Sequence, residues 1–273
     1  MYKNDKEIAI TFIAGVLIGA LALGLFIKFF MKKPPAPPVR IKKTVAAPIA
    51  KPAARVAIIL DDFGYNYKNV EAVFKIRRPV TFSVLPNLTY SRTISRQAQE
   101  MGYKVILHLP LEPYERDRIV KPELGTITVD MKPEQVGAVF SKDLESTPGA
   151  AGVSNHQGSE ATENEPLMKA VFVEIKKRGL FFVDSLVTNR SVCKKVAKDC
   201  DIRFASRDIF LDNKEDFEYI SGQMQRLIKL AKKKGFAVGI GHDRTATVAA
   251  LARLMPDAEK NGIKFVFVSE LVK

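Results

Sequence analysis

From residue 55 onward, short apolar runs alternate with longer segments whose apolar residues recur at helical spacing. Continuous apolar runs are typical of strands buried on both faces, and the longer segments are typical of crossover helices. The alternation predicts an α/β domain with parallel strands, in a barrel or an open sheet. The predicted strands are residues 56–60, 80–85, 104–107, 151–153, 180–183, 203–205 with 209–211, 237–240 and 264–268. The predicted helices are residues 66–75, 90–101, 133–146, 166–177, 191–198, 214–233 and 246–260.

Residues 109–132 interrupt this alternation, because they contain three prolines and show little periodicity. We expect a long loop here. A loop of this length inside a domain is often functional, so it is a candidate wall of a substrate site.

The first 54 residues follow a different pattern. Residues 8–27 form an uncharged run of 20 residues, long enough to span a bilayer at about 1.5 Å per residue. The run exceeds the apolar region of a typical signal peptide and lacks an obvious cleavage site, so we favour a membrane anchor. The Pro- and Lys-rich stretch that follows predicts an extended tether. The expected division is a tail at 1–7, an anchor at 8–30, a linker at 31–54 and a domain at 55–273.

The predicted anchor raises two further questions. Gly15 and Gly19 have the GxxxG spacing that can pair membrane helices, although small residues are frequent throughout this span. More Lys and Arg residues flank the span on its C-terminal side than on its N-terminal side. Taken alone, this asymmetry would keep the domain in the cytoplasm.

The net charge of +13 is concentrated at the N-terminal end. Ten of the 43 basic residues but only two of the 30 acidic residues lie in 1–55, which leaves +5 for the domain. Such a balance is ordinary for a domain of this size, so we do not expect nucleic acid as a partner. The basic tether is better suited to anionic lipid headgroups.

The two cysteines leave the redox environment open. Cys193 and Cys200 are seven residues apart, which is about 10 Å within one helix and too far for a disulfide. A bend near Asp199 would bring them together, and a bridge would imply an oxidising compartment. Two free thiols are the alternative.

Polar side chains gather where the predicted strands end. His108, His156 and His242 are the three histidines of the chain, and each follows a predicted strand, as do Asp61 and Asp62. Because the carboxyl ends of parallel strands meet at one rim, we expect a shared site there. Two histidines and a carboxylate are an ordinary open site for Zn²⁺ or a similar ion, which would also offset the repulsion between adjacent carboxylates. A solvated turn is the alternative for the Asp pair.

Other catalytic motifs are missing from the sequence. It contains no CxxC, no GxSxG elbow, and neither of the glycine-rich phosphate-binding motifs GxGxxG and GxxxxGK[ST]. These absences lower the expectation of redox-cysteine, serine-hydrolase or nucleotide-binding activity.

Several strings resemble the divergent polysaccharide deacetylases, the YibQ-like branch of the NodB-homology carbohydrate esterases. The resemblance extends over essentially all of residues 55–273 and keeps the order of the family's motifs. The strings are LDDFG (60–64), FSVLP (82–86), HLPLEP (108–113), GVSNHQGS (152–159), FFVDS (181–185), RDIFLD (207–212) and IGH (240–242).

The resemblance implies a distorted (β/α) barrel with a metal-dependent hydrolase site. By analogy with the NodB motif, Asp61 is the expected general base, and Asp62, His108 and His156 are the expected ligands of a divalent metal, with Zn²⁺ first. His242 is the expected acid that protonates the leaving amine. A metal that polarises the carbonyl, a base and an acid are the groups that amide hydrolysis needs.

The chain departs from the family pattern at two places. Ordinary NodB-type enzymes use an HxxxH pair, but Glu112 stands four residues after His108, so the second histidine must come from elsewhere. Glu112 is then a candidate ligand or neighbour of the metal. Asp243 follows His242 where relatives have proline.

We expect five residues to contact the substrate. For Arg207, the alternative is an ion pair with Asp208 or Asp212. The five residues are Asn155, Glu112, Asp184, Arg207 and Asp208.

Together these features predict a metal-dependent N-deacetylase-like hydrolase acting on an envelope glycan such as peptidoglycan. A polymer outside the cytoplasm explains the tether, so we expect a single-pass protein of the inner membrane whose domain faces the periplasm or the extracytoplasmic side. The alternatives are a non-catalytic glycan-binding or scaffold protein, which the missing HxxxH favours, and a hydrolase of other amides or esters.

Overall fold

The computed structural model describes residues 25, 28, 53–118 and 122–273. The predicted anchor at 8–30, its Gly15 and Gly19 pair and nearly all of the linker at 31–54 lie outside the described residues. In the described part of the chain, no helix combines the length and the apolar character needed to cross a membrane.

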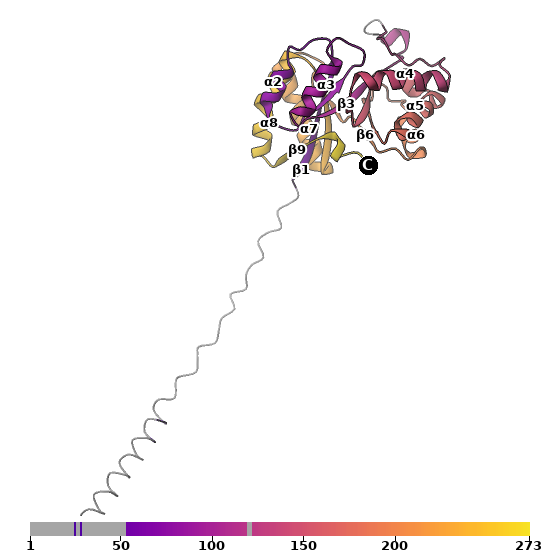
Figure 1. The fold of residues 1–273 in the computed structure, drawn as a ribbon. Coiled ribbons are helices and arrows are strands. Elements are labelled where there is room, and N and C mark those ends of the chain that lie inside the picture. The colour runs from indigo at the N-terminus through magenta and orange to yellow at the C-terminus, as the bar shows by residue number, and fades with distance from the viewer. Residues whose placement is uncertain (1–24, 26–27, 29–52, 119–121) are drawn as a thin grey trace, which may run out of the picture. The chain divides into compact units, whose positions relative to one another are not determined.

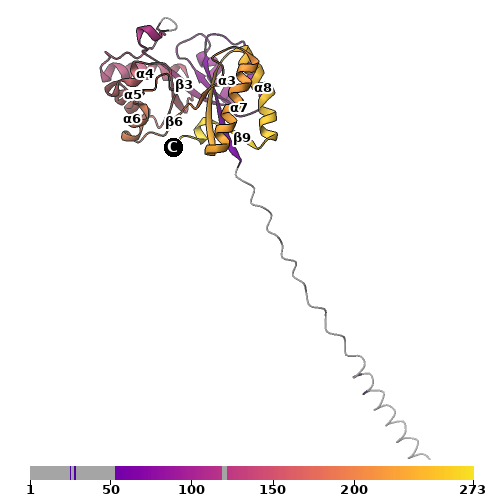
Figure 2. The ribbon, with the colours of Figure 1, turned by 180° about the vertical axis from the view of Figure 1, so that it is seen from behind.

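A sheet of nine parallel strands organises the described residues (Figures 1 and 2). The strand order is β6-β5-β4-β3-β2-β1-β8-β7, and β9 pairs with the start of β1. Among the described residues no pairing joins the end strands β6 and β7, so the predicted barrel is an open half-barrel. The strands are β1 (Ala54–Phe63), β2 (Thr81–Val84), β3 (Lys104–Leu111), β4 (Gly152–Gln157), β5 (Phe181–Asp184), β6 (Phe204–Ser206), β7 (Ile209–Phe210), β8 (Phe236–His242) and β9 (Ile263–Val266).

Seven α-helices of the described residues cover the sheet in two groups (Figure 1). One group packs around β1, β2 and β8, and the other packs around β3, β4 and β5. The first group is α2 (Val70–Ile76), α3 (Ser91–Glu100), α7 (Phe217–Lys234) and α8 (Thr245–Lys260). The second group is α4 (Pro133–Ser146), α5 (Glu165–Lys177) and α6 (Cys193–Asp199).

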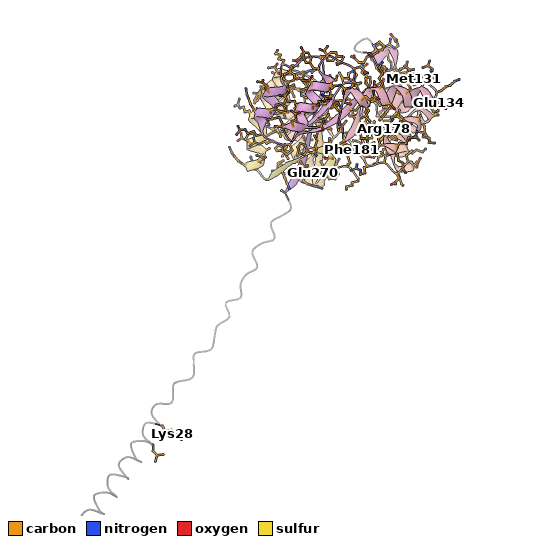
Figure 3. The ribbon with its side chains drawn as sticks, in the orientation of Figure 1. Lys28, Met131, Glu134, Arg178, Phe181 and Glu270 are labelled. Carbon is orange, nitrogen blue, oxygen red and sulfur yellow. The ribbon has the colours of Figure 1, made fainter. Side chains whose placement is uncertain are left out.

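Both faces of the sheet are buried, as the continuous apolar runs predict. In β1, Val56, Ile58 and Leu60 pack towards the helices, while Ala57 and Ile59 join a separate inner cluster. Phe181, labelled in Figure 3, belongs to the same inner cluster. The inner face is thus filled by apolar side chains along the middle of the strands, and polar side chains remain for the strand ends.

The strands continue beyond the apolar runs that predict them. β1 includes Asp61 and Asp62, β3 includes His108, and β4 includes His156. The predicted loop at 109–132 likewise begins as strand, because Leu109–Leu111 still pairs with β4 and Leu111 bridges to Ile127. Hydrophobicity marks where a strand is buried in the core, but the backbone ladder continues into the polar site.

The helices agree closely with their predicted ranges, although α2, α6 and α7 begin later than predicted. α4 has the predicted bounds, whereas α2 begins at Val70 instead of residue 66. The side chain of Asn66 accepts a hydrogen bond from the backbone N–H of Lys68 at 2.9 Å. This local turn replaces the first helical turn.

Both cysteines are free thiols at opposite ends of α6. Cys193 is buried and Cys200 is half-buried, and the helix runs without a bend between them. Of the two alternatives left open by the sequence, the structure shows the two free thiols, and burial raises the pKa of the Cys193 thiol.

Candidate metal centre and active site

A bulge at the end of β1 turns two consecutive carboxylates to the same side. The pairing of β1 with β2 shifts register between Leu60 and Phe63, and Asp62 has a φ of 68° in the left-handed region. Consecutive residues of a regular strand point to opposite faces, and a bulge can re-aim one of them. As a result, Asp61 and Asp62 both line one cavity.

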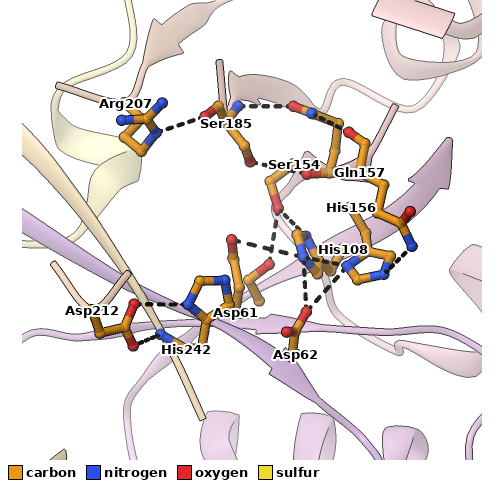
Figure 4. A network of polar contacts seen from close by, with 12 residues as sticks. Asp61, Asp62, His108, Ser154, His156, Gln157, Ser185, Arg207, Asp212 and His242 are labelled. Carbon is orange, nitrogen blue, oxygen red and sulfur yellow. Dashed lines mark hydrogen bonds and ion pairs between the residues drawn. The ribbon is translucent and has the colours of Figure 1, made fainter. Parts of the chain in front are cut away.

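Three donor atoms from three strands meet beside this bulge (Figure 4). His108 Nε2 lies 3.3 Å from Asp62 Oδ1, and His156 Nδ1 lies 3.1 Å from the same oxygen and 3.2 Å from His108 Nε2. Two donors bound at about 2.0–2.1 Å to one tetrahedral ion stand about 3.3–3.4 Å apart. The separations and the donor types both fit a divalent ion, so these residues could hold a metal.

His108 is oriented by a chain of buried hydroxyl groups. Its Nδ1 lies 2.9 Å from Ser154 Oγ, which lies 2.8 Å from Ser83 Oγ. A proton on Nδ1, donated to Ser154, leaves the lone pair of Nε2 directed at the metal centre. Hydrogen bonds of this kind fix the tautomer of ligand histidines.

His156 has a neutral partner of its own. The side-chain nitrogen of Gln157 lies 3.3 Å from His156 Nε2, and Gln157 Oε1 is buried with no hydrogen-bond partner among the described residues. An amide can present either end to its neighbour. With the oxygen towards Nε2, it accepts the N–H and leaves Nδ1 free for a metal.

The two aspartates titrate in opposite directions. Burial raises the pKa of Asp61, and the nearby charges of His108 and His242 offset only part of this effect. Burial would also raise the pKa of Asp62, but its contacts with His108 and His156 hold it well below its usual range. Asp61 Oδ1 is buried without a hydrogen-bond partner among the described residues. Asp62 is thus suited to bind a cation, and Asp61 to exchange a proton.

His242 stands across from Asp61 and has a carboxylate partner. Asp61 and His242 are register partners in the pairing of β1 with β8, and His242 Nδ1 lies 2.8 Å from Asp212 Oδ1. Burial would lower the pKa of His242, but Asp212 raises it to about 8. Asp212 is itself fixed, because its Oδ2 accepts hydrogen bonds from the backbone N–H of His242 and from Thr247. His242 is therefore suited to donate a proton at neutral pH.

One cavity of about 620 Å³ unites these groups. Its volume lies in the range typical of small-molecule sites. Asp61, Asp62 and the three histidines line it, and the other lining residues come from β4, from β7 and from loops that follow the strands. Those residues are Tyr65, Pro113, Asp117, Asn155, Gln157, Gly158, Ser159, Ser185, Val187, Phe210, Asn213 and Arg244.

Of the five predicted substrate contacts, only Asn155 lines the cavity. Its side-chain oxygen accepts the backbone N–H of Ser185 at 2.8 Å, and its amide nitrogen donates to the carbonyl of Gln157 at 2.9 Å. Asn155 therefore holds the strand ends together. Glu112 lies outside the lining, because its carboxylate accepts the backbone N–H of Val129 at 2.7 Å. Glu112 is not part of the donor cluster, and His156 supplies the second histidine.

The other three predicted substrate contacts also lie outside the cavity lining. Asp184 accepts hydrogen bonds from Leu186 N–H and Ser191 Oγ, which fix the turn after β5. Asp208 pairs with Lys234 at 2.8 Å and accepts the N–H of Val238. These carboxylates support the backbone around the site.

Arg207 does not form an ion pair with Asp208 or Asp212, which was the alternative to a substrate contact. Its guanidinium donates to the carbonyls of Ser185 at 2.6 Å and Leu186 at 2.8 Å, and it stacks on Phe210 at 3.7 Å. This arginine fixes the loop after β5 and the ring that packs against His242.

Sequence reasoning left the partners of the histidines without a role. Asp212 carried a usable signal, because it ends the RDIFLD string next to a predicted strand. Ser154 and Gln157 carried none, since a serine or a glutamine near a histidine is common in any chain. Only the packing of β2, β3 and β4 shows which of them touch a ring nitrogen.

A family model described as divergent polysaccharide deacetylase matches residues 58–272. A protein of Haemophilus influenzae, described as uncharacterized, is 33% identical over 72% of this chain and 70% of its own length. The uncharacterized protein YibQ of Escherichia coli is 29% identical over 74% of this chain and 63% of its own length.

Two solved structures share the fold. An uncharacterized protein from Agrobacterium tumefaciens has a TM-score of 0.75 and 23% identity, covering 82% of this chain and 91% of its own. The catalytic domain of a peptidoglycan N-acetylglucosamine deacetylase from Eubacterium rectale has a TM-score of 0.50 and 16% identity, covering 82% of this chain and 92% of its own. The second likeness shows that a peptidoglycan N-acetylglucosamine deacetylase has the same half-barrel fold.

Proposed function

Because this chain belongs to the divergent polysaccharide deacetylase family, we propose that it is a metal-dependent hydrolase that removes acetyl groups from an N-acetylated envelope glycan such as peptidoglycan. The expected family is confirmed by the family model and by the likeness to YibQ. The reaction and the metal are the proposal. The observation that carries it is the meeting of the Asp62, His108 and His156 donors with Asp61 and His242 in one cavity.

The donor cluster is the part that would hold the metal. A divalent ion bound by Asp62, His108 and His156, with Zn²⁺ as the first candidate, would polarise the acetamide carbonyl and make water a better nucleophile at neutral pH. Ser154 and Gln157 would keep the two ligand nitrogens free of protons.

Asp61 is the proposed base. Its raised pKa brings the carboxylate closer to neutrality, where a base can both accept and release a proton. Its unpartnered Oδ1 can take the proton of the attacking water. A bond then forms between the water oxygen and the carbonyl carbon.

His242 is the proposed acid. Asp212 keeps its imidazole charged at neutral pH, so its free Nε2–H can be donated to the departing nitrogen as the carbon–nitrogen bond breaks. The products are acetate and a free amine on the sugar. The transfer of a proton at each end of the reaction needs two groups of different pKa, and Asp61 and His242 supply them.

Acetate release tests this function directly. The full chain is incubated with N-acetylated glycan strands, with and without Zn²⁺, and acetate is measured. Zinc-dependent release that disappears in Asp61→Asn supports the proposal. Release from simple acetate esters or other amides, but not from glycans, would transfer the same chemistry to another substrate class.

The alternative function is a non-catalytic glycan-binding or scaffold protein, and the missing HxxxH pair is the sequence feature that favours it. His156 contributes a nitrogen 3.2 Å from His108 Nε2. The presence of Glu112 in place of the second histidine of HxxxH is therefore no longer an argument that the metal site is lost. A pure binding protein also has no need of the His242–Asp212 pair beside Asp61. These contacts favour catalysis.

We also propose that residues 8–30 anchor the chain in the inner membrane with the domain on the extracytoplasmic side. The support is the uncharged run at 8–27 and the polymeric nature of the proposed substrate. A topology reporter fused after Lys273 tests this, since activity of a cytoplasm-only reporter contradicts it.

A further inference from the structure

The ends of three helices meet around the start of β1, where the linker joins the domain. The backbone N–H of Arg55 donates to the carbonyl of Gly235, directly after α7, at 3.0 Å. Arg55 is also the register partner of Lys264 where β1 pairs with β9, the strand that follows α8 (Figure 1). Arg78, just after α2, forms an ion pair with Glu259 of α8 at 2.8 Å. The ends of α2, α7 and α8 are therefore neighbours at this edge of the sheet.

Basic side chains are concentrated at these helix ends. Three carboxylates near them already form ion pairs with other basic residues at 2.8 to 3.0 Å, namely Asp208, Asp257 and Glu259. Five further basic residues are exposed and have no ion-pair partner among the described residues. We call these five the entry patch. They are Lys75, Arg77, Lys232, Lys233 and Lys264.

The entry patch is more than an ordinary set of helix ends. A helix dipole attracts basic residues to the last turn, which accounts for Lys75, Lys232 and Lys233. Arg77 and Lys264 lie outside the helices, so the dipole does not explain them. The patch gathers free positive charge from α2, α7 and β9 around one point of the surface.

The sequence before the entry patch has the same sign of charge. The linker at 31–54 contains six basic residues and no acidic residue. With the proposed anchor at 8–30, this linker keeps the start of β1 within at most about 80 Å of the bilayer. An anchored chain thus holds the patch within reach of lipid headgroups.

The cavity lies at the opposite edge of the sheet. From Arg55 to Asp61, β1 rises by about 20 Å. The cavity lining there contains three carboxylates, Asp61, Asp62 and Asp117, and one arginine, Arg244. A negatively charged plane would attract the entry patch more strongly than the cavity edge, so it would favour one orientation of the domain.

We propose that the entry patch binds the anionic headgroups of a phospholipid bilayer and turns the cavity away from the membrane. The partner is an array of phosphate diesters, which exposed basic residues from several elements can contact at the same time. Each basic residue near such a surface strengthens binding about fivefold. This surface lies outside the proposed catalytic site, and its binding does not require hydrolysis.

The reactivity of lysine side chains tests this orientation. The full chain is reconstituted with vesicles of phosphatidylcholine, alone or mixed with phosphatidylglycerol, and acylation of each lysine is measured by mass spectrometry. We expect the four lysines of the entry patch to react at least about threefold more slowly when phosphatidylglycerol is present, and high salt to remove the difference. The anchor is common to both lipids, so the comparison isolates the effect of headgroup charge.

Lysines at the starts of helices are the internal reference. Lys68 precedes α2, Lys132 precedes α4 and Lys194 lies in the first turn of α6, which places them at the cavity edge. They should react equally in the two lipids. Equal reactivity of the entry patch in both lipids, or the same slowing at the cavity edge, would overturn the proposed orientation.

A pair of variants tests the charge itself. Lys232→Gln/Lys233→Gln removes two charges and should weaken binding about 30-fold, so the slowing at Lys75 and Lys264 should disappear. Lys132→Gln/Lys194→Gln removes the same charge from the cavity edge and should keep the slowing. Both pairs are exposed. Slowing that survives in Lys232→Gln/Lys233→Gln would refute the entry patch.

Two further measurements separate this proposal from others. Slowing by soluble polyphosphate with phosphatidylcholine vesicles, but none by phosphatidylglycerol, would replace the membrane with a soluble polyanion and overturn the proposal. A chain that releases no acetate but shows the lipid-dependent slowing would lose its proposed hydrolysis and keep the entry patch. An active chain with equal reactivity in both lipids would keep the hydrolysis and lose the entry patch.

Discussion

The three histidines occupy two regions of one cavity, and their partners differ in charge. The ring nitrogens of His108 and His156 that face away from Asp62 contact a hydroxyl and an amide, whereas Nδ1 of His242 contacts the carboxylate of Asp212. Neutral partners orient a ring and leave one nitrogen free of a proton, which suits a metal ligand. A carboxylate favours the imidazolium, which suits an acid. A histidine side chain is therefore suited to bind a metal or to act as an acid, depending on the partner of its second ring nitrogen.

The largest effect is expected where the donor cluster is broken. Asp62→Ala removes the one carboxylate among the three donors, so we expect loss of stoichiometric zinc and of all metal-dependent activity. Metal content of the purified chain by mass spectrometry measures this. Asp243→Ala, a carboxylate that contacts Asn69 outside the donor cluster, is the control and should keep its zinc. Full zinc occupancy in Asp62→Ala would refute the metal centre.

The next effect separates the base from the ligands. Asp61→Asn keeps the shape of the side chain but cannot accept the proton, so we expect the rate to fall by about 10²–10⁴-fold. Zinc affinity should remain close to that of the wild type, because Asp61 lies outside the donor cluster. Acetate release and zinc titration are measured on the same preparation. Loss of zinc together with activity would make Asp61 a ligand instead of a base.

A smaller effect is expected when the partner of His242 is made neutral, like the partners of His108 and His156. Asp212→Asn gives His242 a neutral partner, so the pKa of His242 falls from about 8. The acid must be protonated, and activity is lost as pH rises through this pKa. We therefore expect the alkaline limb of the kcat/KM profile, near pH 8 in the wild type, to move to lower pH. If the alkaline limb does not move, a group other than His242 produces it.

The smallest effect is expected at the hydroxyl that orients His108. Ser154→Ala should weaken zinc binding by about 10–100-fold and leave the alkaline limb in place. Competition with a zinc chelator measures the affinity. Ser95→Ala, another buried serine whose hydroxyl bonds only to a helix carbonyl, serves as the control. Equal affinities in the two variants would remove the orienting role of Ser154.

Much of the candidate site could be predicted because its residues end apolar runs. Asp61, Asp62 and the histidines stand out against the strands before them, and parallel strands place their carboxyl ends at one edge. Glu112, Asp184 and Asp208 stand at similar positions, yet their carboxylates bind backbone N–H groups instead. Position after a strand does not reveal where a side chain points, since one bulge or turn reverses it.

By itself, the sequence determined the parallel α/β class, the positions of the helices and the set of strand-end acids and histidines. These follow from local hydrophobic periodicity, which each segment carries alone. Only the tertiary structure decided that the sheet stays an open half-barrel, that Glu112 stays outside the donor cluster, and that Asp212 contacts His242. These depend on register and on a bulge in β1, which arise from contacts between residues far apart in the chain.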